Sequence, residues 1–363
     1  MSEGFRAPIR SALTVCTRPW LEYHRLFLVE DRSSWSIHWD MLELSAAAKR
    51  LGIKTAAPFW KSFSKNQAVF FGSQFYLLAD DWVSSPHRIA TAYFHGKPGT
   101  GHEEFDQLYQ QLSKHHTKIA RLQVSHSEME TILLETGIAP EKVHRIPIGI
   151  DVDLFPQQTP QSKKESRLSL GIPEDAFVVG SFQKDGEGWG DGDQPKLIKG
   201  PDVFVKTLDK LKDSIPKLHV LISGPARGYL KTELGKRNIP FTHHSFKHYP
   251  DISKLYQALD VYLVASRQEG GPKAVLESMS SGVPLVTTRV GQAMDMVVDG
   301  QNGYMTAVED TEGLADRLLT VFRRSENLHP LLSEARKCAE ANHYPRLDPL
   351  WTFFMQGFVE SSK

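Results

Sequence analysis

Short runs of β-branched and other apolar residues alternate with longer segments of helical periodicity along most of this chain of 363 residues. Apolar runs of this kind between helical segments are typical of βα units, in which helices join successive parallel strands. The sequence therefore predicts an α/β fold built on parallel sheets. Strands are expected at residues 25–30, 68–72, 88–94, 121–125 and 143–149, and again at 176–182, 218–224, 261–266, 284–288 and 303–307.

The length of the chain and one polar segment predict two domains. The segment DVDLFPQQTPQSKKESRLSLGIPEDA begins at Asp151, is rich in Pro, Gln and Ser, and separates the two sets of strands. Such a composition is typical of a linker. We therefore expect one domain over residues 1–150 and a second over residues 151–340, with the boundary between Asp151 and Glu165. Ligands of open parallel sheets bind beyond the carboxyl ends of the strands, so the loops that follow those ends should carry the site.

Charge and cysteine content narrow the classes of protein to consider. The formal net charge is +0, which gives no overall attraction to nucleic acid or to an anionic membrane. Cys16 and Cys338 are the only two cysteines, and they lack metal-like or C-x-x-C spacing, which favours a reduced, cytoplasmic setting. We expect neither a signal peptide nor a membrane span. Arginines interleaved with apolar residues near the N-terminus leave peripheral contact with the inner face of the membrane open, beside the alternative of a solvated arm.

The stretch EGGPKAVLESMSSGVPLV, residues 269–286, combines a Gly-Gly-Pro turn with the start of a helix. A proline suits the first helical turn, so Pro272 is expected near the first helical position. The amides of residues 273–275 would then point out of the helix, and together with the helix dipole they favour an anion such as phosphate. Gly270 and Gly271 would let that ligand approach the backbone closely.

Two glutamates flank this turn, with Glu269 before it and Glu277 just over one helical turn inside the helix. Both carboxylates can therefore border the same small volume. Carboxylates accept hydrogen bonds from sugar hydroxyls, and two of them beside a phosphate site indicate a nucleotide sugar. The alternative is structural, because Lys273 and Glu277 have the i,i+4 spacing of a surface ion pair and Glu269 can be a solvated loop charge.

A longer pattern around these glutamates resembles a known family. Glu269, seven residues, Glu277 and the following SMSSGVPLVTTRVGQAMDMVVDGQNGYMT are similar to the donor-site signature of family 4 retaining glycosyltransferases. The segments IPIGIDVDLF, FVVGSF, IKGPDVFVKTL, HVLISGPARG and LYQALDVYLVAS extend the resemblance over about residues 146–310. It implies the GT-B fold, in which two Rossmann-like domains enclose a cleft. The first domain would bind the acceptor and the second the nucleotide sugar, and a C-terminal helix over residues 341–363 would cross back to the first domain.

The resemblance also assigns roles to residues of the second domain. It implies that Glu277 binds the ribose hydroxyls and that Glu269 contacts the transferred sugar. Lys199, in IKGPD, matches the phosphate-binding lysine of the family. The family usually has an arginine shortly after the glycine of the first strand, whereas here Gly180 is followed by SFQKDG, so Lys184 is the candidate for that cation. The turn residues expected to contact the donor are Gly270, Gly271, Lys273 and Ala274.

The first domain resembles the family less closely, and two of its residues are candidates. His95, in AYFHG, is similar to the family histidine that reaches the donor sugar, and Ser125, in LQVSHSE, is similar to a family serine. For a lone histidine the structural alternative stays open. Acceptor contacts are expected in this domain, where aromatic rings can stack on sugar rings or form the core. The tryptophans concerned are Trp35, Trp39, Trp60 and Trp82.

The chemistry of the site needs positive charge near the leaving group. Breaking the bond between an anomeric carbon and a phosphate places negative charge on the leaving oxygens, where Lys199 and Lys184 would stabilise it. Lysines and a helix start can take the place of a divalent ion, so we expect no metal and no cofactor besides the donor substrate. Asp191 and Asp193 form a D-x-D pattern, which in another fold class would bind a metal together with the nucleotide. Here the two residues lie in a glycine-rich loop, which is typical of turns.

The function expected from these features is a metal-independent, retaining glycosyltransferase. It would move a hexose from a nucleoside diphosphate sugar to a glycan or glycolipid acceptor, with no nucleic-acid partner. Two alternatives stay open: a nucleotide-sugar epimerase or hydrolase of GT-B fold, and a non-catalytic nucleotide-sugar-binding partner protein.

Overall fold

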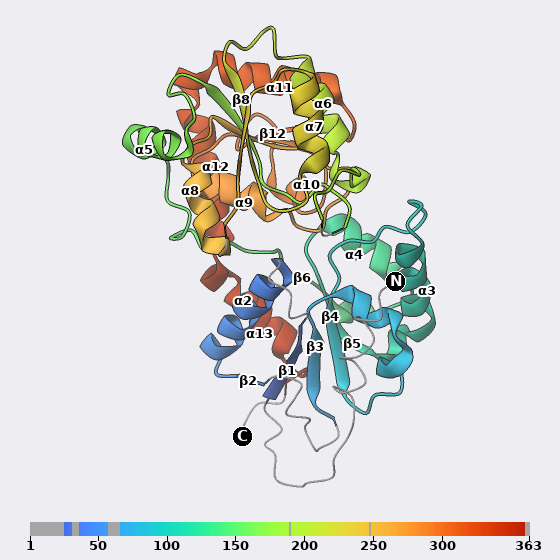
Figure 1. The fold of residues 1–363 in the computed structure, drawn as a ribbon. Coiled ribbons are helices and arrows are strands. Elements are labelled where there is room, and N and C mark those ends of the chain that lie inside the picture. Colours follow the sequence, from blue (N-terminus) through green and yellow to red (C-terminus); the bar gives the residue numbers. More distant parts are fainter. Residues whose placement is uncertain (1–24, 31–35, 57–65, 189, 247, 360–363) are drawn as a thin grey trace. The chain divides into compact units, whose positions relative to one another are not determined.

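The computed structural model describes residues 25–30, 36–56, 66–188, 190–246 and 248–359. Contacts divide the chain into two units, an N-terminal unit formed by Met1–Ile148 with Tyr344–Lys363 and a C-terminal unit formed by Gly149–His343. Each unit is built on a six-stranded sheet (Figure 1). The predicted fold class, α/β with two Rossmann-like domains, is confirmed. The predicted cleft between the domains stays a prediction.

The sheet of the N-terminal unit is parallel throughout and has the strand order β2-β1-β3-β4-β5-β6. Helices cover both of its faces, because successive residues of one strand enter different core clusters. Leu26 shares its cluster with residues of α2 and α13, and Phe27 shares another with residues of α3 and α4. The elements are β1 (Arg25–Val29), α2 (Ser36–Arg50), β2 (Lys54–Ala56), β3 (Ala68–Phe71), β4 (Arg88–Ala92), α3 (Glu103–His115), β5 (Ile119–Val124), α4 (Ser127–Leu134), β6 (Val143–Arg145) and α13 (Asp348–Met355).

The last helix, α13, is distant in sequence from the rest of the N-terminal unit and packs on its sheet. Phe354 lies 5.9 Å, between ring centroids, from Phe70 of β3. The guanidinium of Arg50, at the end of α2, donates two hydrogen bonds of 2.8 Å to the carboxylate of Asp348. Figure 1 shows α13 beside α2 and the first strands. The C-terminal residues therefore complete the core of this unit.

The sheet of the C-terminal unit is also parallel and has the order β12-β11-β10-β7-β8-β9. The chain begins in the middle at β7, continues outward through β8 and β9, and then returns to the other side of β7. The point where the order reverses therefore lies between β7 and β10, which is where open α/β sheets bind ligands.

Helices cover both faces of this second sheet as well. Val178 and Val179, neighbours on β7, belong to different core clusters. The elements are α5 (Pro160–Leu170), β7 (Phe177–Ser181), α6 (Pro201–Asp209), β8 (Leu218–Ser223), α7 (Gly228–Lys236), β9 (Phe241–His244), α8 (Ser253–Tyr256), β10 (Val261–Val264), α9 (Lys273–Ser280), β11 (Leu285–Thr288), α10 (Ala293–Met296), β12 (Tyr304–Thr306), α11 (Thr311–Arg323) and α12 (His329–Ala341). Among the residues that the structure describes, no helix has both the length and the apolar character needed to cross a membrane.

The polar segment that was predicted to be a linker is instead a packed part of the C-terminal unit. Helix α5 begins with a capping box, in which Thr159 and Ser162 exchange hydrogen bonds between side chain and backbone, and it ends at Gly171 with a left-handed φ of 67°. The linker prediction was therefore wrong, because the polar composition belongs to a capped helix.

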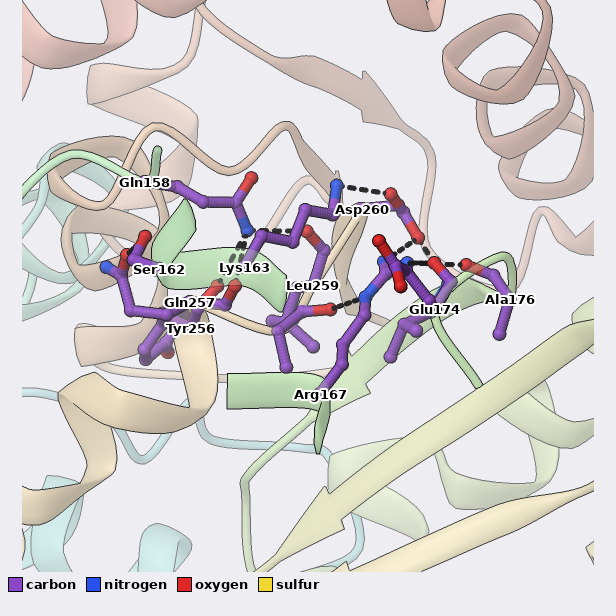
Figure 2. Close-up of polar contacts among 12 residues, drawn as sticks. Gln158, Ser162, Lys163, Arg167, Glu174, Ala176, Tyr256, Gln257, Leu259 and Asp260 are labelled. Atoms are coloured by element: carbon purple, nitrogen blue, oxygen red, sulfur yellow. Dashed lines mark hydrogen bonds and ion pairs between the residues drawn. The ribbon is translucent and has the colours of Figure 1, made fainter. Parts of the chain in front are cut away.

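The polar side chains of this segment are used to bind backbone carbonyls (Figure 2). The amide of Gln158 donates hydrogen bonds of 2.9 Å to the carbonyls of Gln257 and Leu259. Arg167, only 4% exposed, donates to the carbonyl of Ala258 at 3.0 Å and to Oδ2 of Asp260 at 2.6 Å. These bonds fasten α5 to the turn between α8 and β10. They show how a sequence rich in Gln, Ser and Lys packs against the unit through hydrogen bonds while most of its residues stay exposed or half-buried.

Candidate functional site

Two loops at the point where the strand order reverses bring together a lysine and a glutamate. Lys199 ends the loop that follows β7, and Glu269 lies in the loop that follows β10. The Nζ atom of Lys199 is 2.6 Å from Oε2 of Glu269. Glu269 is 9% exposed, whereas the side chain of Lys199 is 26% exposed. The pair therefore lies at the carboxyl edge of the sheet, with the lysine as its more accessible member.

The close approach of these loops depends on Gly200. This residue has a φ of +63°, in the left-handed region that favours glycine. A Cβ atom added to Gly200 would lie 1.9 Å from the carbonyl oxygen of Ala265, the residue that follows β10. Only glycine therefore allows Lys199 to reach the loop that carries Glu269, and this gives a physical reason for the sequence IKGPD.

Glu277 lies inside α9 and is buried, with 3% exposure. Its Oε2 accepts a hydrogen bond of 2.7 Å from the phenol of Tyr256, and its Oε1 accepts one from the phenol of Tyr249. Burial and the carboxylate of Glu277 raise the pKa of Tyr256 well above its usual value, so this phenol keeps its proton and donates. The two phenols hold the carboxylate in one orientation.

The structural alternative, an i,i+4 ion pair of Lys273 with Glu277, stays open, but Glu277 is not a surface residue. Glu277 is buried among phenols, and the Nζ atom of Lys273 lies over the ring of Tyr249, 5.8 Å from its centroid. Lys273 therefore lies on the same aromatic group that orients Glu277. A cation over an aromatic face is a favourable contact.

The turn before α9 differs in detail from the prediction. Pro272 is the residue before the helix, which begins at Lys273, and the amide of Val275 donates to the carbonyl of Pro272 at 3.0 Å. The prediction that Val275 presents its amide to a ligand was therefore wrong, because the cap uses it. Lys273 and Ala274 supply the remaining first-turn amides of the predicted anion site. The carbonyl of Gly270 accepts a hydrogen bond of 3.0 Å from the amide of Gln292, which fixes the turn.

Lys184 lies in the loop after β7, immediately before a hairpin-like insertion. The amide of Lys196 donates to the carbonyl of Asp185 at 2.7 Å, and Gly186 pairs with Pro195 in an antiparallel bridge, so the insertion starts and ends at one place. Burial and the nearby charge of Lys196 lower the pKa of Lys184. The two lysines are thus close enough to repel each other, and an anion beside them would relieve that repulsion.

The D-x-D residues of the insertion serve as turn residues through their backbone. The carbonyl of Asp191 accepts the amide of Gly228 at 2.6 Å, and the carbonyl of Gly192 accepts the amide of Tyr229 at 2.8 Å. A different group of potential metal ligands, Asp151, Asp153 and His343, lies within 4.8 Å in the described part of the chain. Exposed acidic groups of this kind are common without a metal, and we assign none to them.

His95 and Ser125 lie at the carboxyl edge of the sheet of the N-terminal unit. The amide nitrogen of Gln74 is 3.3 Å from Nδ1 of His95 and donates to its carbonyl at 2.9 Å. Ser125 is 2% exposed, and the next residue, His126, links the two loops through a contact of 3.2 Å between its Nε2 and the carbonyl of Phe94. The contacts of His95 and Ser125 with a donor stay predictions.

The tryptophans of the N-terminal unit have different environments. Trp82 is 1% exposed, and its indole donates to the carbonyl of Leu77 at 3.1 Å, so it belongs to the core and is not a platform for sugar. Trp39 is half-buried beside His38, with ring centroids 6.0 Å apart. Trp35 and Trp60 lie outside the described residues.

Part of this chain is similar in sequence to known glycosyltransferases. Residues 195–338 match the family model of glycosyl transferases group 1, a span that contains Lys199, Glu269 and Glu277. The D-inositol 3-phosphate glycosyltransferase of Corynebacterium urealyticum is 27% identical over 65% of this chain and 56% of its own length. The same enzyme of Saccharomonospora viridis is 30% identical over 56% of this chain and 47% of its own. The chain thus spans about half the length of the curated relatives it matches.

Solved structures are similar over more of the chain. HepE of Anabaena, crystallised with UDP and glucose, is 16% identical, with a TM-score of 0.73 over 92% of this chain and 99% of its own. Sucrose-phosphate synthase of Thermosynechococcus elongatus is also 16% identical, with a TM-score of 0.67 over 81% of this chain and 74% of its own. These similarities show the fold, which is GT-B.

Proposed function

We propose that this protein is a retaining glycosyltransferase that moves a hexose from a nucleoside diphosphate sugar to a glycan or glycolipid. The matches to group 1 glycosyl transferases support glycosyl transfer in general. The observation that carries the finer proposal is the meeting of Lys199 and Glu269 at the reversal point of the sheet, 2.6 Å apart. A cation, a carboxylate and the start of α9 there suit a pyrophosphate linked to a sugar.

The roles proposed for these residues follow from where charge develops. As the bond to the anomeric carbon breaks, the leaving phosphate gains negative charge, and a fixed ammonium stabilises it in the transition state. Lys199 has this role, with Lys184 as a second cation. Glu269 contacts the transferred sugar, and Glu277, held by two phenols, accepts hydrogen bonds from the ribose. Because lysines supply the positive charge, the reaction is proposed to need no metal.

The test is a thermal-shift panel of nucleoside diphosphate sugars with the full chain, starting with UDP-sugars because HepE was crystallised with UDP and with UDP-glucose. A ligand at a hundred times its dissociation constant adds about 2.7 kcal/mol of stability, which is easily measured. A clear stabilisation by one donor, followed by transfer to an acceptor with retained configuration, supports the proposal. Release of free sugar or of an isomer at full rate without acceptor would instead identify a hydrolase or an epimerase.

A further inference from the structure

We propose that Gln183 is a positioning residue for the pair formed by Lys199 and Glu269, and that it acts together with Ser266. The inference rests on the proposed function for its meaning, since it states how the donor-binding cation is held. Both residues are uncharged, and the sequence analysis assigned neither of them a role.

The amide of Gln183 bridges the two loops of the site. Its Nε2 donates a hydrogen bond of 2.9 Å to the carbonyl of Lys199, and its Oε1 lies 3.3 Å from the hydroxyl of Ser266. A carbonyl oxygen only accepts, so the nitrogen of the amide must face Lys199 and its oxygen must face Ser266. The orientation of the amide is therefore determined by its partners.

Ser266 holds Glu269 directly. The side chain is fully buried, and its hydroxyl has one proton to donate. The nearest acceptor is Oε1 of Glu269 at 2.8 Å, while the carbonyl of Lys199 and Oε1 of Gln183 are both 3.3 Å away. A bond to an ionised carboxylate is the strongest of the three. One oxygen of Glu269 is thus held by Ser266, and the other faces the ammonium of Lys199 at 2.6 Å.

A buried ion pair holds the backbone of Gln183 in place. The guanidinium of Arg227, in the loop after β8, donates to the carbonyl of Gln183, to the carbonyl of Ser223 at 2.8 Å and to the hydroxyl of Ser181 at 3.0 Å. Its Nε is 3.1 Å from Oδ1 of Asp185, and both side chains are almost fully buried. A buried charge is tolerated only with such partners. The pair therefore fixes the end of β7 and the start of the loop that carries Gln183.

This arrangement matters because lysine has a flexible stem. Stabilisation of a developing charge is effective when the cation is already in place and does not have to reorganise. Gln183 fixes the backbone of Lys199, and Ser266 fixes the carboxylate that faces its ammonium. Loss of either contact should loosen the pair while the fold remains.

The experiment uses Gln183→Met and Ser266→Ala in the full chain, with Gln158→Met as the matched control. Gln158 also binds backbone carbonyls through its amide, but it does so beside α5 and not at Lys199 (Figure 2). The first measurement is labelling of Lys199 by an amine-reactive reagent in the free protein, quantified by mass spectrometry against exposed Lys206. The second measurement is the affinity for UDP by calorimetry.

We expect Gln183→Met and Ser266→Ala to raise the relative labelling of Lys199 and to weaken UDP binding by about 2- to 10-fold each, the range for loss of one hydrogen bond. Gln158→Met should lower the melting temperature without changing either quantity. Unchanged labelling and unchanged UDP affinity in both site variants would overturn the inference. If UDP fails to bind even the wild-type protein, the UDP donor of the proposed function is refuted, while the labelling of Lys199 still decides the positioning role.

Discussion

Lys199 and Glu269 are 70 positions apart in the sequence, and a contact of 2.6 Å joins their side chains. The contact exists because β7 and β10 are neighbours, so the loops that follow them meet. In the free protein each of the two charges compensates the other. A diphosphate that enters the site has to compete with Glu269 for the ammonium of Lys199, so the proposed function depends on this pair.

Replacement of Lys199 by methionine tests the role of the ammonium in catalysis. Lys199→Met should lower the rate of sugar transfer by about 10²- to 10³-fold, because a preorganised donor to the leaving group is lost. Lys206→Met is the matched control, since Lys206 lies on α6 with 65% of its side chain exposed and 3.8 Å from Asp202. Initial rates at saturating donor measure both variants. Equal rates for Lys199→Met and Lys206→Met would exclude the proposed role.

The tyrosine phenols that donate hydrogen bonds to Glu277 should strengthen nucleoside binding. Tyr256→Phe removes a buried hydrogen bond to a charged group and should cost about 1.5–3 kcal/mol in folding stability. It should also weaken UDP binding, because the carboxylate is no longer held in one orientation. Tyr304→Phe, at another buried tyrosine on the edge strand β12, serves as the control. Chemical denaturation and calorimetry give the two quantities, and a wild-type UDP affinity for Tyr256→Phe would contradict this role.

Two glycines have nearly the same backbone conformation, so replacing each of them distinguishes the cost of backbone strain from the cost of a steric clash. Gly171→Ala, at φ +67° with nothing within 4 Å of the new Cβ, should cost about 1–2 kcal/mol from the left-handed conformation alone. Gly200→Ala, at φ +63°, adds a collision with the carbonyl of Ala265 and should cost about 2–5 kcal/mol in total. Only Gly200→Ala should also reduce UDP affinity, because it displaces Lys199. Similar losses of stability and affinity in both variants would disagree with this assignment.

The stability of the N-terminal unit should fall in mild acid because of His144 on β6. Its ring lies 5.0 Å from that of Phe354, and burial together with the nearby charge of Arg121 lowers its pKa from 6.5 to about 4. In the unfolded chain His144 therefore binds a proton as the pH falls below about 6.5. In the folded chain its ring stays neutral until about pH 4. This contribution to stability is complete above pH 6.5 and is lost progressively down to pH 4.

Urea denaturation of wild-type protein and His144→Leu between pH 7.5 and pH 4.5 measures this effect. The wild-type protein should lose more stability over that interval than the variant, because leucine takes up no proton. Carboxylates titrate in both proteins, so the difference between the two curves isolates the histidine. Parallel curves would show that His144 does not stay neutral in the folded state.

The repeating pattern of the sequence was sufficient to predict most of the fold. Buried strands such as β3 and β10 are continuous apolar runs, and such a run is local information. Two strands were not predicted: β2, with the sequence KTA, and β9, with the sequence FTHH. Both are short and lie at the edge of a sheet, where polar residues are tolerated. The capped helix α5 was mistaken for a linker because its attachment to the unit depends on carbonyls about 90 positions away, such as that of Ala258.

The site shows the same limit of local information. Lys199, Glu269 and Glu277 stand in recognisable motifs, whereas the groups that orient them do not. Tyr249 and Tyr256 reach Glu277 from the segment before β10, and nothing in their local sequence indicates a carboxylate partner. Arg227 has the sequence of an ordinary loop arginine, and its burial follows only from the adjacency of β7 and β8. Adjacency of strands is the information that a single sequence supplies least directly.

A crystal structure of the full chain with bound UDP tests the central claim most directly. We predict that the ribose hydroxyls lie within hydrogen-bond distance of the carboxylate of Glu277, and that the distal phosphate contacts the ammonium of Lys199 and the first amides of α9. UDP bound away from the carboxyl edge of β7 and β10, or bound without contact to Glu277 and Lys199, would contradict it.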